Sequence, residues 1–168
     1  TGKIQAAKMI EESIKRAGLT LKNLVLEPIA SSAAVLSEKE KEAGVVLVDI
    51  GGGTTDIAIF HKNVIRHSAV IPFGGQVITN DIQHGCHILE DQAEKLETKF
   101  GVAISVDSTK HQVVSIPKVN GGQPRQISVQ TLSEIIKCRM GEIFELVDME
   151  IRASGYHGKL LAGIVLTG

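Results

Sequence analysis

The chain has 168 residues, of which 43% are hydrophobic and 22% are charged, and its formal net charge is -1. This length suits one ordinary domain or two small ones, and the hydrophobic fraction is sufficient to fill a core. The near-neutral charge argues against a basic face for nucleic acid. The lack of Trp and an aromatic content of 3% argue against stacking on single-stranded nucleic acid.

The cysteine content and the hydropathy pattern predict a soluble polypeptide with free thiols. Cys86 and Cys138 form no CxxC pair and are expected to stay reduced in a cytosolic protein. No apolar run approaches the roughly 20 residues that span a bilayer, and no signal peptide opens the sequence. Because the sequence starts at Thr1 without a Met and stops at Gly168 after a predicted strand, we expect a piece of a longer protein.

The first part of the chain predicts two helices and a short strand. Apolar residues recur at helical spacing over residues 4–17, which predicts the first helix. Residues 24–26 are predicted to form a short strand. A proline in the first turn suits a second helix over residues 28–36, and residues 37–42 are predicted to be a charged surface turn.

The middle of the chain predicts three strands followed by two helices. A β-branched run over residues 45–49 predicts a buried strand, and residues 56–60 and 64–71 predict two more. One helix should follow the glycine pair at 74–75. A second helix should carry an apolar stripe over residues 89–100.

The last part of the chain predicts a small sheet, a long helix and a final strand. Residues 102–128 contain short alternating stretches, which predict a small antiparallel sheet around an exposed Asn-Gly-Gly loop. Apolar spacing over residues 132–151 predicts a long helix, and residues 160–166 predict a last buried strand. This order predicts an α/β fold with a small α+β insertion between the central strands and the last one.

One segment, Asp49–Asp56, carries a recognisable chemical pattern. A buried strand delivers Asp49 to its end, and three glycines follow, which allow positive φ and a close approach to a ligand. Successive N–H groups in such a turn bind anions, and a carboxylate there can hold Mg²⁺. The residues predicted to cradle phosphate are Gly51, Gly52, Gly53, Thr54 and Thr55, with Asp49 as the metal ligand. The alternative is a glycine-rich hairpin turn with a surface Asp.

This segment resembles the second phosphate motif of the superfamily that contains actin, heat-shock chaperones and sugar kinases. Neighbouring segments narrow the resemblance to the bacterial cell-division protein family FtsA. The segments that carry it are Leu26–Ser31, Val48–Phe60, Arg66-His67, Ile71–Gly75, Thr79–Ile82 and Ala162–Gly168. No Gly-Lys-Ser/Thr follows the glycines, so the Walker-type mechanism does not apply.

The resemblance implies one lobe of an actin-like ATPase. Residues 1–84 and 153–168 would form an inner, ribonuclease-H-like subdomain with the phosphate motif. Residues 85–152 would form a small α+β outer subdomain. The cofactors implied are ATP and Mg²⁺. Because phosphoryl transfer needs groups on several sides of the phosphates, we expect this piece to hydrolyse no ATP, and the full-length protein to be a weak ATPase at most.

The resemblance also assigns an adenosine side to the site. Gly168 falls at the start of the family's adenosine motif, and Glu94 matches an acidic residue that related proteins place near the nucleotide. Three positions on, the family has a lysine where this chain has Glu97, and a carboxylate cannot donate as an ammonium does. The alternative is that both residues belong to the solvated face of an amphipathic helix.

A partner surface is implied on the outer subdomain. In the family this part binds the C-terminal tail of the tubulin-like protein FtsZ, and Arg139 matches the arginine that faces the tail, with Cys138 in place of the family's proline. An arginine suits a carboxylate because its planar fork binds with two hydrogen bonds. The alternative is an exposed arginine in an ordinary surface ion pair.

The resemblance implies a cellular role that reaches beyond this chain. A family member is a peripheral membrane protein of septum formation, which self-associates into cytoskeletal filaments. It sits on the cytoplasmic face of the inner membrane at the division site and is held there by a C-terminal helix absent from this sequence. The other actin-like candidates are a pilus-assembly platform ATPase and a chaperone-like ATPase. The segments around residues 66–67, 74–75 and 79–82 favour the FtsA family.

Overall fold

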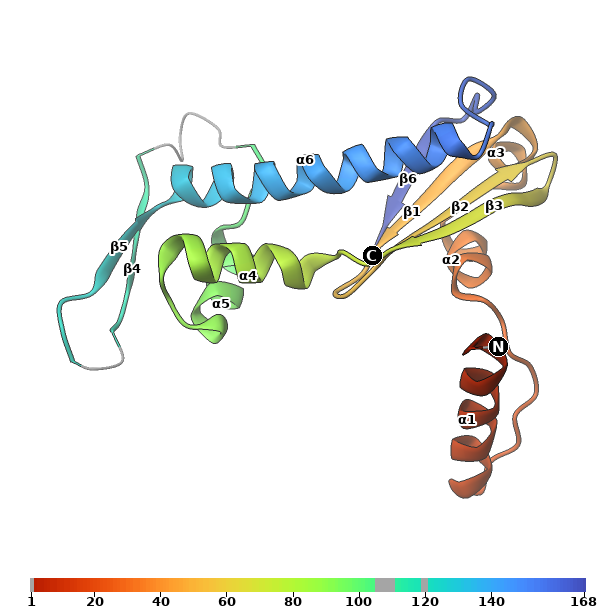
Figure 1. The fold of residues 1–168 in the computed structure, drawn as a ribbon, viewed down its shortest axis with the longest axis horizontal. Coiled ribbons are helices and arrows are strands. Elements are labelled where there is room, and N and C mark those ends of the chain that lie inside the picture. The colour runs from red at the N-terminus through yellow and green to blue at the C-terminus, as the bar shows by residue number, and fades with distance from the viewer. Residues whose placement is uncertain (1, 105–110, 119–120) are drawn as a thin grey trace.

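A four-stranded sheet lies at the centre of the first group of elements (Figure 1). The structure is a computed structural model, which describes residues 2–104, 111–118 and 121–168. The sheet has the strand order β3-β2-β1-β6, and its strands are β1 (Val45–Ile50), β2 (Thr55–His61), β3 (Val64–Ile71) and β6 (Ile164–Thr167). β1 pairs antiparallel with β2 and parallel with β6, so β1 is an interior strand.

The side chains of β1 and β2 form a core on both faces of the sheet. Residues 45–48 are at most 1% exposed, and this explains their unbroken hydrophobic pattern. One face carries the cluster Leu36, Val45, Leu47, Ala58 and Phe60, and the other carries Val46, Val48, Ile57, Ile59, Ile71, Val147 and Ile151. Helices α2 (Glu27–Val35) and α3 (Glu38–Ala43) contact the sheet from the first face, and the end of α6 (Val129–Ala153) packs on the second.

The second group of elements has its own hydrophobic cluster (Figure 1). It comprises α4 (Gly75–Cys86), α5 (Glu90–Phe100), the start of α6, and a two-stranded sheet of β4 (Val113–Ile116) and β5 (Arg125–Ser128). Its buried members include Ile82, Leu96 and Leu132, which are at most 2% exposed. α6 therefore joins both groups, because its two ends are buried in different clusters.

We propose that these two groups are the inner subdomain (residues 1–84 and 153–168) and the outer subdomain (residues 85–152). Separate hydrophobic clusters support this division. The proposed boundary at residue 84 falls inside α4, whose buried Ile78 and Ile82 pack in the cluster of the second group.

Most predicted elements are confirmed, and three are wrong. The small antiparallel sheet is present, with Val114 opposite Ile127. Residues 24–26 are not a strand, because no described strand lies beside them to supply hydrogen bonds. The predicted surface turn at 37–42 is instead helix α3. The last strand is not buried either: β6 lies at the edge of the sheet, and Ile164 and Leu166 are 53% and 54% exposed.

Helix α3 owes its start to a reciprocal cap. The Ser37 hydroxyl oxygen accepts a hydrogen bond from the Glu40 N–H at 3.3 Å, and the Ser37 N–H donates to the Glu40 carboxylate at 2.7 Å. The N–H groups of Ser37 and Glu40 would otherwise be unsatisfied at the end of the helix. The serine and the acid three positions later are the sequence signal that the turn prediction overlooked.

Ser37→Ala is expected to lower the free energy of unfolding by about 1 kcal/mol at pH 7, the usual cost of losing such a cap. Hydrogen bonds from the Ser37 N–H and hydroxyl hold the pKa of Glu40 below its ordinary value of 4.5. A carboxyl with a lowered folded pKa stabilises above its unfolded pKa, and that stabilisation is lost as the pH falls through the folded pKa. The variant keeps the N–H hydrogen bond, which is the larger cause, and loses only that of the hydroxyl. Urea unfolding should therefore show a slightly smaller difference between wild type and variant below pH 4.5 than at pH 7. A difference independent of pH would contradict this.

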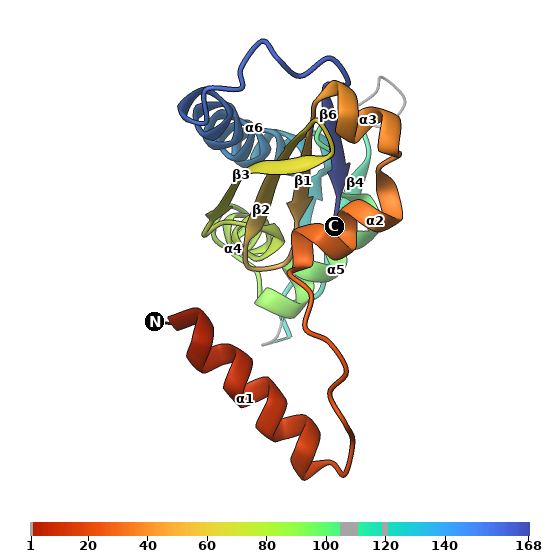
Figure 2. The ribbon, with the colours of Figure 1, turned by 90° about the vertical axis from the view of Figure 1, so that its right-hand side faces the viewer.

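Helix α1 (Gly2–Arg16) stands apart from the sheet (Figures 1 and 2). Its apolar Ile4, Met9 and Ile10 are 66%, 67% and 45% exposed. Among the described residues, no helix is both long and apolar enough to cross a membrane.

Candidate functional site

The glycine-rich segment forms the turn between β1 and β2. The Gly51 N–H donates to the Thr54 carbonyl oxygen at 2.9 Å, which closes the turn. None of the three glycines at 51–53 has a positive φ, so the predicted need for positive φ is wrong, while the predicted close approach of a ligand stays a prediction. They serve by leaving room: a Cβ on Gly52 or Gly53 would meet no atom within 4 Å. The backbone at this point faces open space that a ligand could fill.

The same turn is fixed to the beginning of α4. The Gly75 and Gln76 N–H groups donate to the carbonyl oxygens of Gly51 and Gly52 at 2.9 and 2.7 Å. A Cβ on Gly74 would lie 2.3 Å from the Gly51 carbonyl oxygen, closer than real Cβ atoms approach. Gly74 is therefore the residue that allows helix and turn to meet, and the carbonyls of the turn satisfy two N–H groups that a helix end leaves unpaired.

Asp49 lies at the end of β1 and is oriented by a neighbouring helix. The Ser31 hydroxyl in α2 donates to Asp49 Oδ2 at 2.9 Å. In the β1–β2 register, Asp49 is directly opposite Asp56, whose Oδ2 accepts a hydrogen bond from the Thr54 hydroxyl at 3.0 Å. Like charges directly opposite each other destabilise a sheet, so a cation beside them would be stabilising. The sequence reasoning assigned roles to neither Ser31 nor Asp56.

The two threonines of the motif differ in what they offer. Thr54 is exposed at the turn. Thr55 is 0% exposed, and its hydroxyl donates to the Phe73 carbonyl oxygen at 2.8 Å. A hydroxyl committed in this way braces the turn against the start of α4, and a role of Thr55 in binding phosphate stays a prediction.

Gly168 lies beside the β1–β2 turn. β6 runs parallel to β1, so both strands end at the same edge of the sheet, and the C-terminus lies next to the β1–β2 turn (Figure 1). A Cβ on Gly168 would lie 2.2 Å from the Ile50 carbonyl oxygen, and its φ is 142°. Only glycine fits this position without displacing β1.

The acidic pair on α5 behaves differently from the pattern that the resemblance implies. Glu94 is exposed, and no described contact joins it to the phosphate turn. Glu97, at the family's lysine position, accepts a hydrogen bond from the Thr79 hydroxyl of α4 at 2.6 Å. Glu97 thus helps to hold α4 and α5 together.

The residues at the carboxyl ends of β1 and β6 suit a magnesium-bound phosphate group. The described residues contain no group of three or more His, Cys, Asp or Glu side chains that could hold a metal ion. Mg²⁺ needs no such cage, since it keeps several waters and binds proteins through one or two carboxylates. Asp49 would be that ligand, with Asp56 beside it, while Gly52 and Gly53 offer the open backbone that a phosphate needs.

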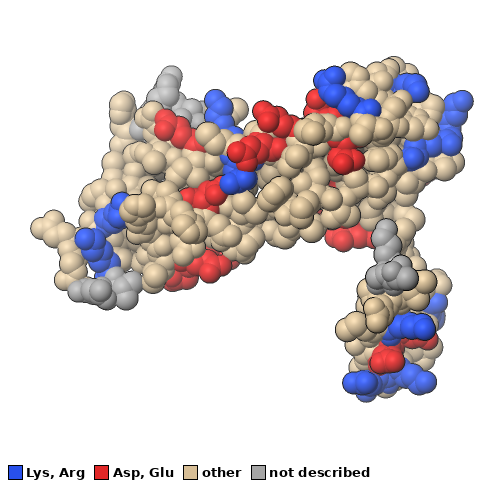
Figure 3. Space-filling model, viewed as in Figure 1, with Lys and Arg blue, Asp and Glu red and all other residues tan. Residues whose placement is uncertain are grey.

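Arg139 on α6 is held by acidic neighbours. Its Nε and Nη2 donate to the two carboxylate oxygens of Asp81 at 2.6 and 3.1 Å, and its Nη1 pairs with Glu142 at 2.5 Å. The hydrogen bonds with Asp81 raise the pKa of the Arg139 guanidinium. Sequence gave no signal for this pair, because 58 positions separate its members. Acidic side chains dominate along α6 on the face in Figure 3.

A shallow, open depression of 390 Å³, called the groove below, adjoins this pair. Its walls come from α4 and α6, and the lining residues are Asp81, Glu134, Ile135, Cys138 and Arg139. The Cys138 side chain is exposed. Three of the five N–H hydrogens that a guanidinium carries are committed to Asp81 and Glu142, so two remain for a further acceptor.

Family models match most of the chain. The model of the cell division protein FtsA matches residues 46–167, and the Hsp70 protein model matches residues 5–65. FtsA of Pseudomonas aeruginosa is 44% identical over 165 residues, which cover 98% of this chain and 40% of that protein. FtsA of Bacillus subtilis is 36% identical over 155 residues, which cover 92% of this chain and 35% of that protein. The chain thus spans about two fifths of the length of these relatives.

Solved structures share the fold at low sequence identity. MreB5 of Spiroplasma citri superposes with a TM-score of 0.80 at 21% identity, over 95% of this chain and 52% of that one. The MamK filament gives a TM-score of 0.69 at 17% identity, over 98% of this chain and 51% of that one. The predicted actin-like ATPase fold is therefore confirmed. Because the FtsA model matches more than half of its residues, the chain belongs to the FtsA family of cell-division proteins.

Proposed function

We propose that the chain is the nucleotide-binding lobe of an actin-like division scaffold, which tethers FtsZ filaments to the membrane. The observation that carries the nucleotide half is the β1–β2 turn. It combines an oriented carboxylate, open backbone at Gly52 and Gly53, and a rigid attachment to α4. The solved MreB5 structures, described as bound to ADP and to AMPPNP, support this use of the fold.

Each candidate residue at the carboxyl ends of β1 and β6 has a proposed role. Asp49 holds Mg²⁺ through an oxygen that Ser31 leaves free. The N–H groups of Gly52 and Gly53 face the phosphates, while Gly51 contributes by closing the turn with its N–H. Thr54 binds phosphate once its hydroxyl turns away from Asp56, and Gly168 lies on the adenosine side. Glu94 keeps its proposed place on the adenosine side from the resemblance alone. ATP bound to Mg²⁺ would supply the polyphosphate whose presence or hydrolysis changes the state of the scaffold.

The proposed partner site is the groove beside Arg139. Its apolar wall at Ile135 and Cys138 suits an aliphatic side chain of the FtsZ tail, while the two free N–H hydrogens of Arg139 suit a carboxylate. Asp81 and Glu142 fix the guanidinium in place, so it binds with little further loss of side-chain entropy. Self-association into filaments and attachment to the membrane complete the proposed role, on the cytoplasmic face of the inner membrane.

Arg139→Glu is expected to weaken binding of an FtsZ C-terminal tail peptide at least tenfold, which corresponds to about 1.4 kcal/mol. The variant removes the guanidinium and adds a third carboxylate beside Asp81 and Glu142. Isothermal titration of this chain with the peptide measures the effect. Arg152→Glu is the matched control, because Arg152 lies on the same helix in an exposed pair with Asp148.

A second variant separates docking from folding. Cys138→Glu places a charge in the groove while leaving the Asp81–Arg139 pair intact, and it too should lose the peptide. If the folded chain binds the peptide and neither variant weakens it, the groove is not the docking site. If the folded wild-type chain does not bind the peptide at all, the adaptor role falls while the nucleotide proposal stands.

A further inference from the structure

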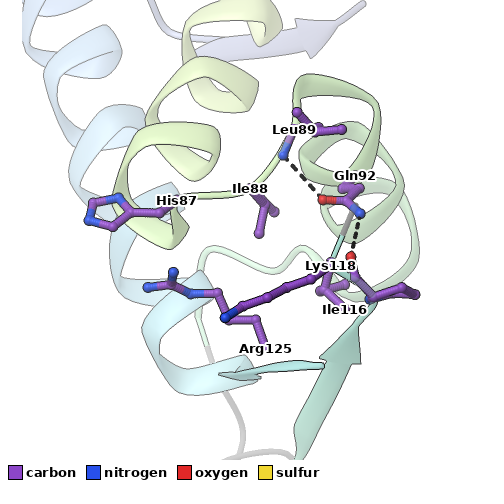
Figure 4. A pocket seen from close by; sticks show the side chains of 8 residues that line it. His87, Ile88, Leu89, Gln92, Ile116, Lys118 and Arg125 are labelled. Carbon is purple, nitrogen blue, oxygen red and sulfur yellow. Dashed lines mark hydrogen bonds between the residues drawn. The ribbon is translucent and has the colours of Figure 1, made fainter. Parts of the chain in front are cut away.

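A pocket of 220 Å³ opens in the second group of elements, beside the connection between α4 and α5 (Figure 4). Three segments far apart in the sequence form it: the α4–α5 connection, the end of β4 and the beginning of β5. The lining residues are His87, Ile88, Leu89, Gln92, Ile116, Pro117, Lys118 and Arg125. This pocket involves neither the phosphate turn nor the groove beside Arg139.

The charges of the lining residues all have one sign. Lys118 and Arg125 are cationic, His87 adds ring nitrogens, and no carboxylate is among the eight residues. The Lys118 and Arg125 side chains both extend toward the side where His87 lies (Figure 4). Arg16, Arg139 and Arg152 each pair with an acidic neighbour, whereas the described ion pairs include neither Lys118 nor Arg125. Two adjacent cations repel each other, so an anion between them would be stabilising.

The backbone holds these cations together. Ile116 and Arg125 are direct partners in the β4–β5 register, and Lys118 follows Ile116 by two residues. His87 caps α4 in a left-handed conformation with φ of 51°. Burial raises the pKa of Cys86, which lies at the end of α4. The positive charge of Arg125 opposes this rise, so Arg125 lies near that end of the helix.

The other lining residues are either apolar or already engaged in hydrogen bonds. Ile88 and Ile116 pack against the buried cluster of α4, α5 and α6. The Gln92 side chain accepts from the Leu89 N–H at 3.2 Å and donates to the Pro117 carbonyl oxygen at 2.9 Å. The Leu89 N–H is therefore not offered to a ligand, and the first turn of α5 carries Glu90 and Asp91. Phosphate binds at a helix N-terminus through free N–H groups, and the Leu89 N–H is not free here, so the pocket is a poor phosphate site.

We propose that this pocket binds an acidic peptide segment in which a carboxylate lies next to a large aliphatic side chain. The carboxylate lies between Lys118 and Arg125, where the guanidinium can donate two parallel hydrogen bonds. The aliphatic side chain rests on Ile88 and Ile116. The pocket is thus a second docking site of the lobe, independent of the groove beside Arg139.

The test is a titration of the ¹⁵N-labelled chain with acetyl-Leu-Asp-Leu-amide, followed by amide chemical shifts. Saturable shifts are expected at residues 87–92, 116, 118 and 125, with binding that weakens as salt is added. Acetyl-Leu-Asn-Leu-amide, which differs only in charge, should bind about tenfold more weakly. Inorganic phosphate should cause no saturable shifts there.

Substitution of Lys118 and of Arg125 tests whether these two residues bind the peptide carboxylate. Arg125→Gln and Lys118→Gln should each weaken the Asp peptide several-fold, while Arg152→Gln, on an exposed part of α6, should not. Lys118 is exposed, so its variant keeps the test valid even if Arg125→Gln perturbs the fold. The proposal is overturned if the Asp and Asn peptides bind alike, if neither binds, or if phosphate competes as strongly as the Asp peptide.

Discussion

Gly74→Ala is expected to lower the free energy of unfolding by about 2 to 3 kcal/mol and to weaken nucleotide binding as well. The added Cβ would lie 2.3 Å from the Gly51 carbonyl oxygen and 2.9 Å from that of Gly52. Both neighbours are backbone atoms that cannot rotate away, so either α4 or the β1–β2 turn must move. The cost is that of an overpacked core position, to which the loss of the Gly75 and Gln76 hydrogen bonds adds.

Urea unfolding of this chain measures the first effect, and Gly52→Ala is the matched control. Gly52 lies in the same turn, but a Cβ there would meet nothing within 4 Å, so its effect on stability should be a few tenths of a kcal/mol. Both variants should weaken nucleotide binding, Gly74→Ala by displacing the turn and Gly52→Ala by occupying the ligand's space. Equal stability losses for the two glycines would show that contact between the turn and α4 does not decide the stability of this region.

Local sequence patterns were sufficient to predict most of the fold. The β-branched run at 45–48 predicts a buried strand because both faces of β1 are covered, and the helical stripe of α6 predicts a helix whose two ends are buried. Residues 24–26 have the composition of a strand but no described partner, because pairing depends on other segments. The exposed positions of β6 could not be foreseen for the same reason, since burial at a sheet edge depends on what lies beside it.

The candidate site was predictable in its chemistry and less so in its geometry. Asp49 and the glycines are adjacent in sequence, so their pattern alone predicts a phosphate-binding turn. What orients them comes from elsewhere: Ser31 lies 18 positions before Asp49, and Gly74 follows the turn by a whole strand pair. The same limit applies to Arg139, whose partner Asp81 is on another helix. A sequence motif predicts which single residues form a site. Hydrogen bonds between segments that are distant in sequence can be identified only in the folded structure.

Asp49→Ala is expected to weaken Mg²⁺-dependent nucleotide binding by more than a hundredfold while leaving the fold intact. Ser31→Ala, which removes only the hydrogen bond that orients Asp49, should weaken it by roughly tenfold to a hundredfold, the range typical for such supporting residues. The chain grafted in place of the matching 40% of the Pseudomonas aeruginosa relative is the protein to test, because both lobes are then present. Calorimetric titration with ADP, with Mg²⁺ and with EDTA, gives the affinities.

The stability of the same variants separates a functional carboxylate from a structural one. Asp49 and Asp56 are opposite each other in β1 and β2, so removing one charge relieves a like-charge contact worth a few tenths of a kcal/mol. Asp49→Ala should thus unfold no more easily than wild type without nucleotide, and nucleotide with Mg²⁺ should stabilise only the wild type, as ligand linkage requires. Asp148→Ala, in an exposed pair on α6, should change neither quantity. If Asp49→Ala keeps its response to Mg²⁺, the metal is held elsewhere, and the turn would be a structural hairpin whose glycines serve only the contact with α4.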